Sequence, residues 1–404
     1  MKKSQEVLLK LLANELFSSN NVIEDLSEDE WKSLFKESCD QAVTIIAYKA
    51  AIKIGIPDSL SFLWEDTVDN YMGKNMVVEY DHIALHEWLT EANIPYVILK
   101  GSSSAYYYPN PLDRTMGDVD FLINKEDIDK CGGILASQGL KVLEVDHICH
   151  IVYRNGDHHY EMHFDLSGVP NGEPGRLVHQ YIHDIIDKSF EYTSDNGSLI
   201  LPSKFHHGLI ILLHTSHHLT GEGVGLRHLC DWAVFLESCT NDEFQELFEE
   251  KFKSIGMWKF ASVLSKICIM YLGCSPKTCL ENTDSEITDS LIEDILFGGN
   301  FGKKESENRH LEARLISDRG KSGVNKKSMV VYFVKSVNES IRNHWPITRK
   351  IPIVIPIGWI YFGFQRVINV MIGKGHFANV SRTINEARKR KELYSKLGIF
   401  ETEK

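Results

Sequence analysis

Residues 98–123 read ILKGSSSAYYYPNPLDRTMGDVDFLI, and this stretch is more informative about function than the rest of the chain. Asp118 and Asp120 lie two positions apart in an apolar run, so a β-strand would place both carboxylates on one face. Two neighbouring anions on an apolar strand cost free energy unless a cation lies between them. The pattern therefore predicts a strand that holds a cation.

A second apolar run, residues 96–99, leads into Lys100, Gly101 and three serines. A glycine–serine turn at the start of a helix presents backbone amides and hydroxyls to a phosphate. We expect Ser102 to make this contact, because it directly follows the glycine, with Ser103 as the alternative. Carboxylates for a divalent cation beside a phosphate-binding turn indicate a nucleotide site.

The order of these motifs resembles the signature of the DNA polymerase beta-like nucleotidyltransferase superfamily. It is most similar to one bacterial branch, an uncharacterised nucleotidyltransferase family often met beside surface-polysaccharide genes. The resemblance extends over residues 80–240 and depends on the following positions: Leu99-Lys100-Gly101, Tyr107, Pro111, Arg114, Gly117-Asp118-Val119-Asp120-Phe121-Leu122, Glu161-Met162-His163, Gly225-Leu226-Arg227 and Asp231. It implies an α+β fold, with a small mixed-sheet nucleotidyltransferase core embedded in a mainly helical protein.

Transfer of a nucleotidyl group requires divalent metal, usually two ions roughly 3.5–4 Å apart. Magnesium prefers carboxylate oxygens, so we expect Asp118 and Asp120 to bind Mg²⁺, with Mn²⁺ as the alternative ion. A third carboxylate is expected on a neighbouring strand, where Glu161 and Asp165 would share one face with His163. We favour Glu161 as catalytic base or third ligand, because it matches the family motif. Asp165 is the second choice, since it lies near the end of the strand.

Basic and imidazole side chains complete the predicted site. Lys100 and Arg114 would offset the charge of the nucleotide phosphates, although each has an ordinary surface interpretation. His163 either orients the metal-binding carboxylates, contacts the substrate, or is a structural histidine. The resemblance favours a role in the site.

A second cluster of polar residues is predicted on helices. His214 and His218 are four apart and share a helix face, but no third zinc ligand accompanies them, which favours a buried polar network or a nucleotide-facing wall. Arg227 and Asp231 are also four apart, a spacing typical of a helix ion pair. By resemblance, both belong to a helical domain that closes over the sheet and contacts the nucleotide.

Composition restricts the class of protein. The chain has 404 residues and a formal charge of −12, which argues against general nucleic-acid binding. Its eight cysteines are scattered without a C-x-x-C pair, as expected of free thiols in a reducing cytoplasm. Glu6, Lys10 and Glu15 interrupt the first apolar stretch, which predicts an amphipathic helix and not a secretory signal. We therefore expect a cytoplasmic protein.

The chain is predicted to divide into five regions. These are an N-terminal helical region (1–80), a catalytic domain (81–190), a helical domain over the site (191–298), a charged linker (299–328) and a C-terminal helical region (329–404). Within them we expect one helix from Ser27 to Ile54, another over 74–92, and strands at 95–100, 117–123, 140–154 and 158–166. An Asn155-Gly156 turn would join the last two strands as a hairpin.

The apolar run 351–372 has the length of a membrane span. Its prolines and glycines, together with Gln365, Arg366 and Asn369, argue for a core or interfacial helix instead. The basic helix expected at 384–396 follows, so the C-terminal region would support peripheral membrane contact at most.

These observations predict a bacterial-type nucleotidyltransferase that binds a nucleoside triphosphate with magnesium. A hydroxyl acceptor, for which the resemblance suggests a sugar or sugar-phosphate, would attack the α-phosphate and release pyrophosphate. One alternative is a toxin-like transferase that modifies tRNA or protein, against which the acidic charge argues. The other is an inactive relative that only binds a nucleotide or a partner, against which the intact aspartate pair argues.

Overall fold

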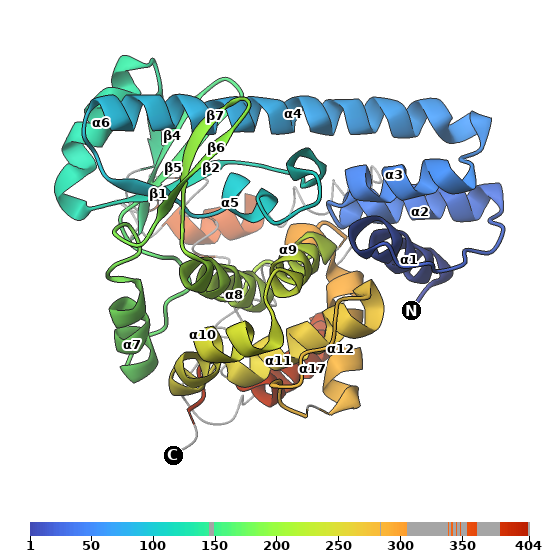
Figure 1. Cartoon of the computed structure of the whole chain (residues 1–404). Helices are drawn as coiled ribbons and strands as arrows, with labels where there is room; N and C mark the ends of the chain where they lie inside the picture. Colours follow the sequence, from blue (N-terminus) through green and yellow to red (C-terminus); the bar gives the residue numbers. More distant parts are fainter. Residues whose placement is uncertain are drawn as a thin grey trace.

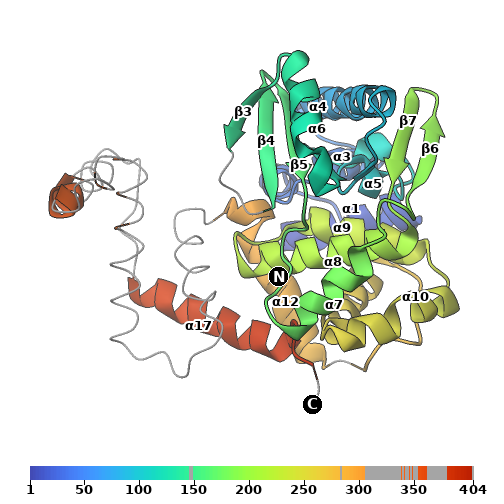
Figure 2. The ribbon, with the colours of Figure 1, turned by 90° about the vertical axis from the view of Figure 1, so that its left-hand side faces the viewer.

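The computed structural model describes residues 1–144, 149–282, 284–304, 354–361 and 380–402, together with positions 338, 341, 345 and 348. It confirms the α+β fold: a five-stranded mixed sheet and a two-stranded sheet lie among helices (Figure 1). The long helix α4 (Asp58–Glu91) crosses one side of the sheets, and a group of helices lies on the other side (Figures 1 and 2).

The five-stranded sheet has the order β1-β2-β5-β4-β3. Strands β2 and β5 run parallel, and the other neighbouring pairs are antiparallel. The strands are β1 (Tyr96–Ile98), β2 (Val119–Ile123), β3 (Lys141–Glu144), β4 (His150–Asn155) and β5 (His158–His163). The second sheet is a hairpin of β6 (Phe190–Ser194) and β7 (Gly197–Leu201). The parallel β2–β5 pair is the element that brings the two carboxylate motifs together.

Alternate residues of the central strands belong to two different cores. Ile98, Phe121 and Met162 pack in a cluster that also contains residues of α4 and of α6 (Ile128–Ser137). Val97 and Leu122 point the other way and join the larger core of the helical layer. Asp118 and Asp120 have the same parity as Leu122, so their side chains lie on the face turned toward the helices.

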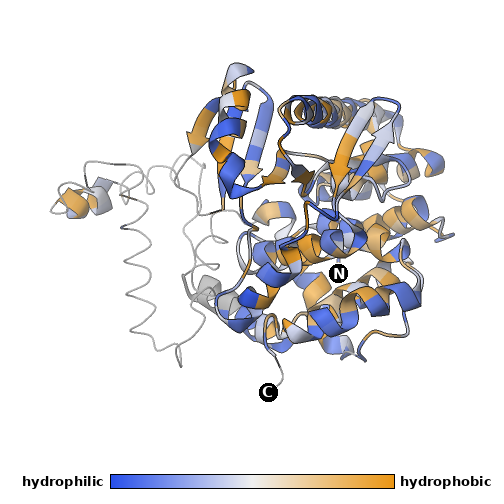
Figure 3. Cartoon of the chain, turned by 60° about the vertical axis from the view of Figure 1, so that its left-hand side comes forward, coloured by the Kyte–Doolittle hydropathy of each residue, from blue (hydrophilic) through white to orange (hydrophobic). Residues whose placement is uncertain are grey.

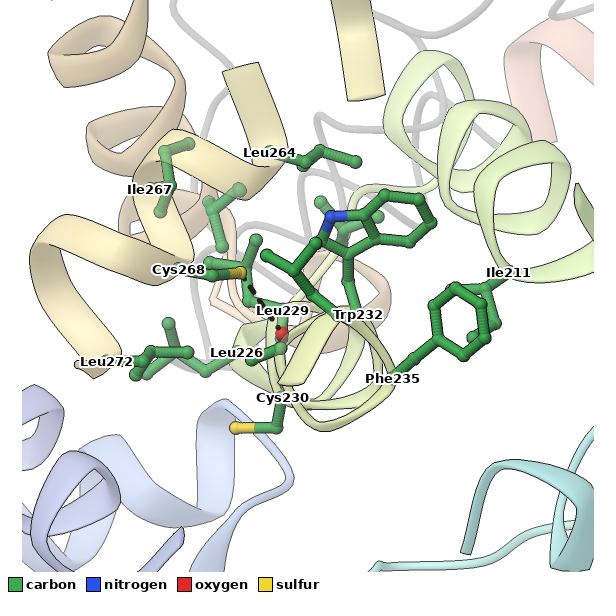
Figure 4. Packing of buried hydrophobic residues seen from close by; sticks show 14 of the residues in the cluster. Ile211, Leu226, Leu229, Cys230, Trp232, Phe235, Leu264, Ile267, Cys268 and Leu272 are labelled. Carbon is green, nitrogen blue, oxygen red and sulfur yellow. Dashed lines mark hydrogen bonds between the residues drawn. The ribbon is translucent and has the colours of Figure 1, made fainter. Parts of the chain in front are cut away.

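The helical layer is built from amphipathic helices around one large core. Hydrophobic and hydrophilic residues alternate along them in Figure 3. In the close view of Figure 4, Trp232 and Phe235 lie among aliphatic side chains, and the thiol of Cys268 donates to the carbonyl of Leu229 at 3.5 Å. The remaining helices of the described residues are α1 (Lys3–Phe17), α2 (Glu28–Asp40), α3 (Thr44–Ile54), α5 (Ser102–Ala105), α7 (Glu173–Ile182), α8 (Lys204–Thr220), α9 (Leu226–Glu237), α10 (Asn241–Ser254), α11 (Trp258–Ile267), α12 (Ser285–Gly298) and α17 (Val380–Leu397).

Several expectations about the elements are confirmed. Helix α1 is amphipathic, and helix α2 begins with the expected cap, in which Ser27 and Glu30 bond each other's backbone amides. The hairpin of β4 and β5 is confirmed, but it turns at Gly156-Asp157 and not at Asn155-Gly156, since Asn155 pairs with His158. All eight cysteines are free. The helix expected at 384–396 corresponds to α17.

Other expectations were wrong. The helix predicted from Ser27 to Ile54 is two helices, α2 and α3, because the chain turns between them with Ala42 at a φ of 55°. The helix predicted over 74–92 begins much earlier, at Asp58, and the strand predicted over 140–154 is two strands. The hairpin β6–β7 was not predicted, although Asn196-Gly197 is a strong turn signal.

Two predicted regions lie largely outside the described residues. These are the charged linker beyond residue 304 and most of the apolar run 351–372, of which 354–361 is mainly helical. Among the helices that are described, none combines the length and the apolar character needed to cross a membrane.

Candidate functional site

The candidate site lies on the helix-facing side of the central sheet. Asp120 of β2 is paired in register with Glu161 of the parallel strand β5, so the two carboxylates are neighbours on one face. Asp118 precedes β2 by one residue and lies on the same side. The structure therefore brings together the three carboxylates that the sequence indicated.

Asp120 is buried and is contacted by two basic side chains. The ammonium of Lys100 lies 2.7 Å from its Oδ1, and Nε2 of His163 lies 3.0 Å from the same oxygen. Burial alone would raise the pKa of Asp120, but Lys100 and His163 outweigh it and hold the pKa well below its usual value. Asp120 is thus an anion at neutral pH.

His163 also reaches the third carboxylate, since its Nε2 lies 3.4 Å from Oε2 of Glu161. Burial alone would lower the pKa of His163, but hydrogen bonds to Asp120 and Glu161 raise it. Asp165, the alternative third carboxylate, lies elsewhere: it accepts from the amide of Leu166 and lies 3.8 Å from Lys125. The geometry favours Glu161 over Asp165.

Asp118 is the most accessible of the three acids. Its side chain is 41% exposed, whereas that of Asp120 is 8% exposed. Nδ1 of His159 lies 2.6 Å from Oδ1 of Asp118, and this hydrogen bond raises the pKa of His159. A ligand can therefore approach the acids from the side of Asp118.

The glycine–serine turn lies beside the aspartates. Gly101 has a φ of 64°, and a Cβ added there would lie 3.7 Å from the carbonyl oxygen of Asp118. The hydroxyl of Ser102 is buried and bonds Nδ1 of His82 at 3.2 Å. The hydroxyl of Ser103 is buried and has no hydrogen-bond partner among the described residues. The predicted phosphate turn and the predicted metal ligands are thus adjacent.

Arg114 and Asp231 bind each other. Nε and Nη2 of Arg114 donate to the two carboxylate oxygens of Asp231, each at 2.8 Å, and the hydroxyl of Tyr108 donates to Oδ1 at 2.8 Å. Both charged residues are only 6% exposed. The helix ion pair expected between Arg227 and Asp231 was wrong, because Asp231 is occupied by Arg114.

Arg227 makes few contacts for a largely buried arginine. Its Nη1 donates to the carbonyl of Thr115 at 3.2 Å, and its guanidinium lies 5.4 Å from the ring centroid of Phe301. Its Nε has no hydrogen-bond partner in the described part of the chain. This cation retains unused donors on the side of the site closed by α9.

The predicted histidine cluster is a buried network behind Lys100. Lys100 lies 3.4 Å from Nε2 of His214, which lies 2.9 Å from Nε2 of His218. His228 of α9 lies beside them, with its ring centroid 5.6 Å from that of His214. Burial lowers the pKa of His218 to about 3, and it lowers the pKa values of His214 and His228 well below the usual value. Neutral imidazoles therefore form the wall that faces the ammonium group.

Sequence reasoning missed three site histidines, namely His82, His150 and His159. His150 pairs in register with His163, and the alternation of the β4–β5 hairpin places it on the face of the acids. The alternation of the predicted hairpin would have placed His150 on this face, but the register that pairs it with His163 was not predicted. His82 lies on α4, and nothing in the sequence linked it to Ser102.

One groove of the described residues lies away from this site. It has a volume of about 1130 Å³ and is lined by residues of α1, α2, α12 and α17, among them Glu37 and Arg390, and by Lys304. None of the predicted site residues lines it.

Comparison with known proteins identifies the family. Residues 27–272 match the model of a family described as uncharacterised nucleotidyltransferase. A crystal structure of an antigenic nucleotidyltransferase-like protein from Paracoccidioides brasiliensis is similar over 50% of this chain and 94% of that one, with 16% identity and a TM-score of 0.32, values too low to carry an argument. None of the curated proteins matches. Because the matched region spans more than half of the sequence, the chain belongs to the uncharacterised nucleotidyltransferase family.

Proposed function

We propose that this protein transfers a nucleoside monophosphate from a nucleoside triphosphate to a hydroxyl acceptor, with release of pyrophosphate. The observation that carries the proposal is the convergence of Asp118, Asp120 and Glu161 beside the Gly101 turn. Such acids have no packing use in a sheet, whereas a triphosphate with its metal ion needs them.

The residues fit a divalent metal ion. The three carboxylates offer oxygen donors, which Mg²⁺ prefers. Asp120 is paired with the ammonium of Lys100, whereas the partners of Asp118 and Glu161 are imidazoles, and Asp118 is 41% exposed. Asp118 and Asp120 would hold the ion, with Glu161 as the third ligand. Bound there, Mg²⁺ would neutralise the triphosphate and make the acceptor hydroxyl more acidic.

The chain's own groups supply the rest of the reaction. Glu161 takes the proton of the acceptor hydroxyl, whose oxygen attacks the α-phosphorus. The bond from that phosphorus to the β-bridging oxygen breaks, and pyrophosphate leaves. Ser102, Ser103 and the backbone after Gly101 bind phosphate oxygens, and Lys100 offsets their charge.

The remaining predicted residues act around this centre. His163 holds Asp120 and Glu161 in place through its contacts with both. Arg227 has donors left for a phosphate or the base. For Arg114 and Asp231 a direct nucleotide contact stays a prediction, and their pairing favours a supporting role.

Isotope placement tests the reaction class. Each of the four common triphosphates, labelled on the α-phosphate or on the γ-phosphate, is incubated with the protein, Mg²⁺ and pools of sugars, sugar-phosphates and proteins. Nucleotidyl transfer moves only the α-label to the acceptor and releases the γ-label in pyrophosphate. Transfer of the γ-label to the acceptor would contradict the proposal.

Substitutions test whether transfer depends on the two aspartates. Asp118→Asn and Asp120→Asn should abolish transfer and the magnesium-dependent thermal shift caused by the triphosphate. Asp157→Asn is the matched control, because it removes one charge from the exposed β4–β5 turn. Equal activity in all three variants would exclude the proposed site.

A further inference from the structure

Two histidines extend the carboxylate site toward the edge of the sheet. His150 of β4 and His163 of β5 are paired in register, and Glu161 lies two residues from His163 on the same face. The ring centroids of the two histidines are 4.9 Å apart. One ligand atom from each of His150, Glu161 and His163 lies within 4.8 Å of the others. This spacing suits a single ion bound by all three.

The donor set differs from that of the aspartates. Two imidazole nitrogens and one carboxylate suit first-row transition ions such as Mn²⁺, Fe²⁺ and Zn²⁺. Mg²⁺ dehydrates reluctantly and prefers oxygen ligands, as Asp118 and Asp120 provide. The face of the sheet thus carries an all-oxygen set and a mixed nitrogen–oxygen set side by side.

The surroundings of His163 support a ligand role. The residue is 2% exposed, and its Nδ1 has no hydrogen-bond partner among the described residues. A buried polar atom without a partner destabilises the fold, and a bond to a metal ion would offset this cost. Asp120 and Glu161, both in contact with this ring through Nε2, supply the negative charge that a divalent cation needs.

Glu161 connects the two sets. It is the register partner of Asp120 on one side and a neighbour of His163 on the other. A carboxylate has two oxygens and can bind two ions at once, as in two-metal sites.

We propose that His150, Glu161 and His163 form a second cation position, which selects a transition ion such as Mn²⁺ over Mg²⁺. This inference specifies which ions bind at the site of the proposed function. The role of the second ion in catalysis rests on that proposed function. Metal selection, however, is measured without nucleotide and without turnover.

Electron paramagnetic resonance of Mn²⁺ tests the proposal on the full chain. In excess Mg²⁺ and without nucleotide, one Mn²⁺ should stay bound, and its electron-spin-echo signal should show coupling to imidazole nitrogen. His150→Gln should weaken Mn²⁺ binding at least about tenfold and reduce the nitrogen coupling. Asp118→Asn should retain the coupling, since that residue belongs to the other set. His183→Gln is the matched control on an exposed histidine.

The wild-type spectrum alone is decisive, whatever the folding of the variants. Bound Mn²⁺ without nitrogen coupling, or displacement of all Mn²⁺ by Mg²⁺, overturns the inference. Unchanged coupling in a folded His150→Gln protein also overturns it. Transfer with Mg²⁺ but no nitrogen coupling would leave the proposed function intact. Nitrogen coupling without any transfer would overturn the proposed function and support the cation position.

Discussion

Arg114 and Asp231, which are 117 positions apart in the sequence, are joined by two hydrogen bonds of 2.8 Å. The pair ties the loop before β2 to helix α9, and both residues are almost completely buried. Replacing both partners of a buried charged pair by apolar residues often changes the free energy of unfolding little. Removing one partner alone lowers it strongly, because the other charge stays buried.

Arg114→Ala should lower the free energy of unfolding by about 3–5 kcal/mol, because Asp231 would stay buried with Tyr108 as its neutral donor. Urea denaturation followed by circular dichroism measures this change. Arg176→Ala is the control, since its pair with Glu173 is exposed and its loss should change stability little. Equal losses in the two variants would contradict a structural role for Arg114.

The choice of third carboxylate gives a second prediction. Glu161→Gln should reduce kcat by about 10²–10⁴-fold, the usual contribution of a general base, without loss of the fold. Asp165→Asn should leave kcat near that of the wild type, since its carboxylate contacts Leu166 and Lys125 and not the acids. Steady-state kinetics with a saturating triphosphate decides between them. The opposite ranking would move the site to Asp165.

The sequence was sufficient to predict the strand of the aspartates and its buried face, because alternation in an apolar run is a local property. Alternation alone did not choose between Glu161 and Asp165, since the two positions have the same parity, and Glu161 was favoured only by the family resemblance. That choice depends on the parallel register between β2 and β5, in which Asp120 pairs with Glu161. Strand pairing across 41 residues leaves no local signal.

Register also explains why His150 was missed. The hairpin was predicted, but its turn residues are Gly156 and Asp157 and not Asn155 and Gly156. A turn one residue earlier would give His163 a partner two positions earlier in the chain. His150 would then keep its face of the sheet but would no longer lie opposite His163. The same limit applies to Arg114 and Asp231, whose contact is set by the docking of α9 against the sheet.

Buried histidines predict a loss of stability in acid. His207 is 1% exposed, stacks on Tyr107 with centroids 4.8 Å apart, and has no hydrogen-bond partner for either nitrogen among the described residues. Burial lowers its pKa to about 3 from the usual 6.5. The unfolded chain therefore binds more protons in mild acid, so the stabilisation is complete above pH 6.5 and is lost progressively toward pH 3.

His207→Phe should retain the aromatic stack and remove this pH dependence. Between pH 6.5 and 5 the variant should lose about 2 kcal/mol less stability than the wild type, at 1.36 kcal/mol per pH unit for one group. Urea midpoints at a series of pH values measure the difference. His183→Gln, a change at an exposed histidine, should follow the wild-type curve. Parallel curves of stability against pH for the wild type and His207→Phe would show that folding does not lower the pKa of His207.

The Gly101 turn gives the last prediction. Its φ of 64° and ψ of −113° fall in a region that side chains rarely adopt, at a cost of about 1–3 kcal/mol. An added Cβ would also lie 3.0 Å from Cε1 of His82, whose Nδ1 bonds Ser102. Gly101→Ala should therefore displace the serine turn and weaken triphosphate binding, measured by isothermal titration.

Gly133→Ala is the matched control for this change. Gly133 lies in helix α6, and an added Cβ there meets nothing within 4 Å. Alanine in a helix is favoured over glycine by about 0.5–1 kcal/mol, so this variant should be more stable and bind the triphosphate normally. Gly101→Ala protein with normal affinity and normal stability would show that the turn tolerates a side chain, and that phosphate is bound elsewhere.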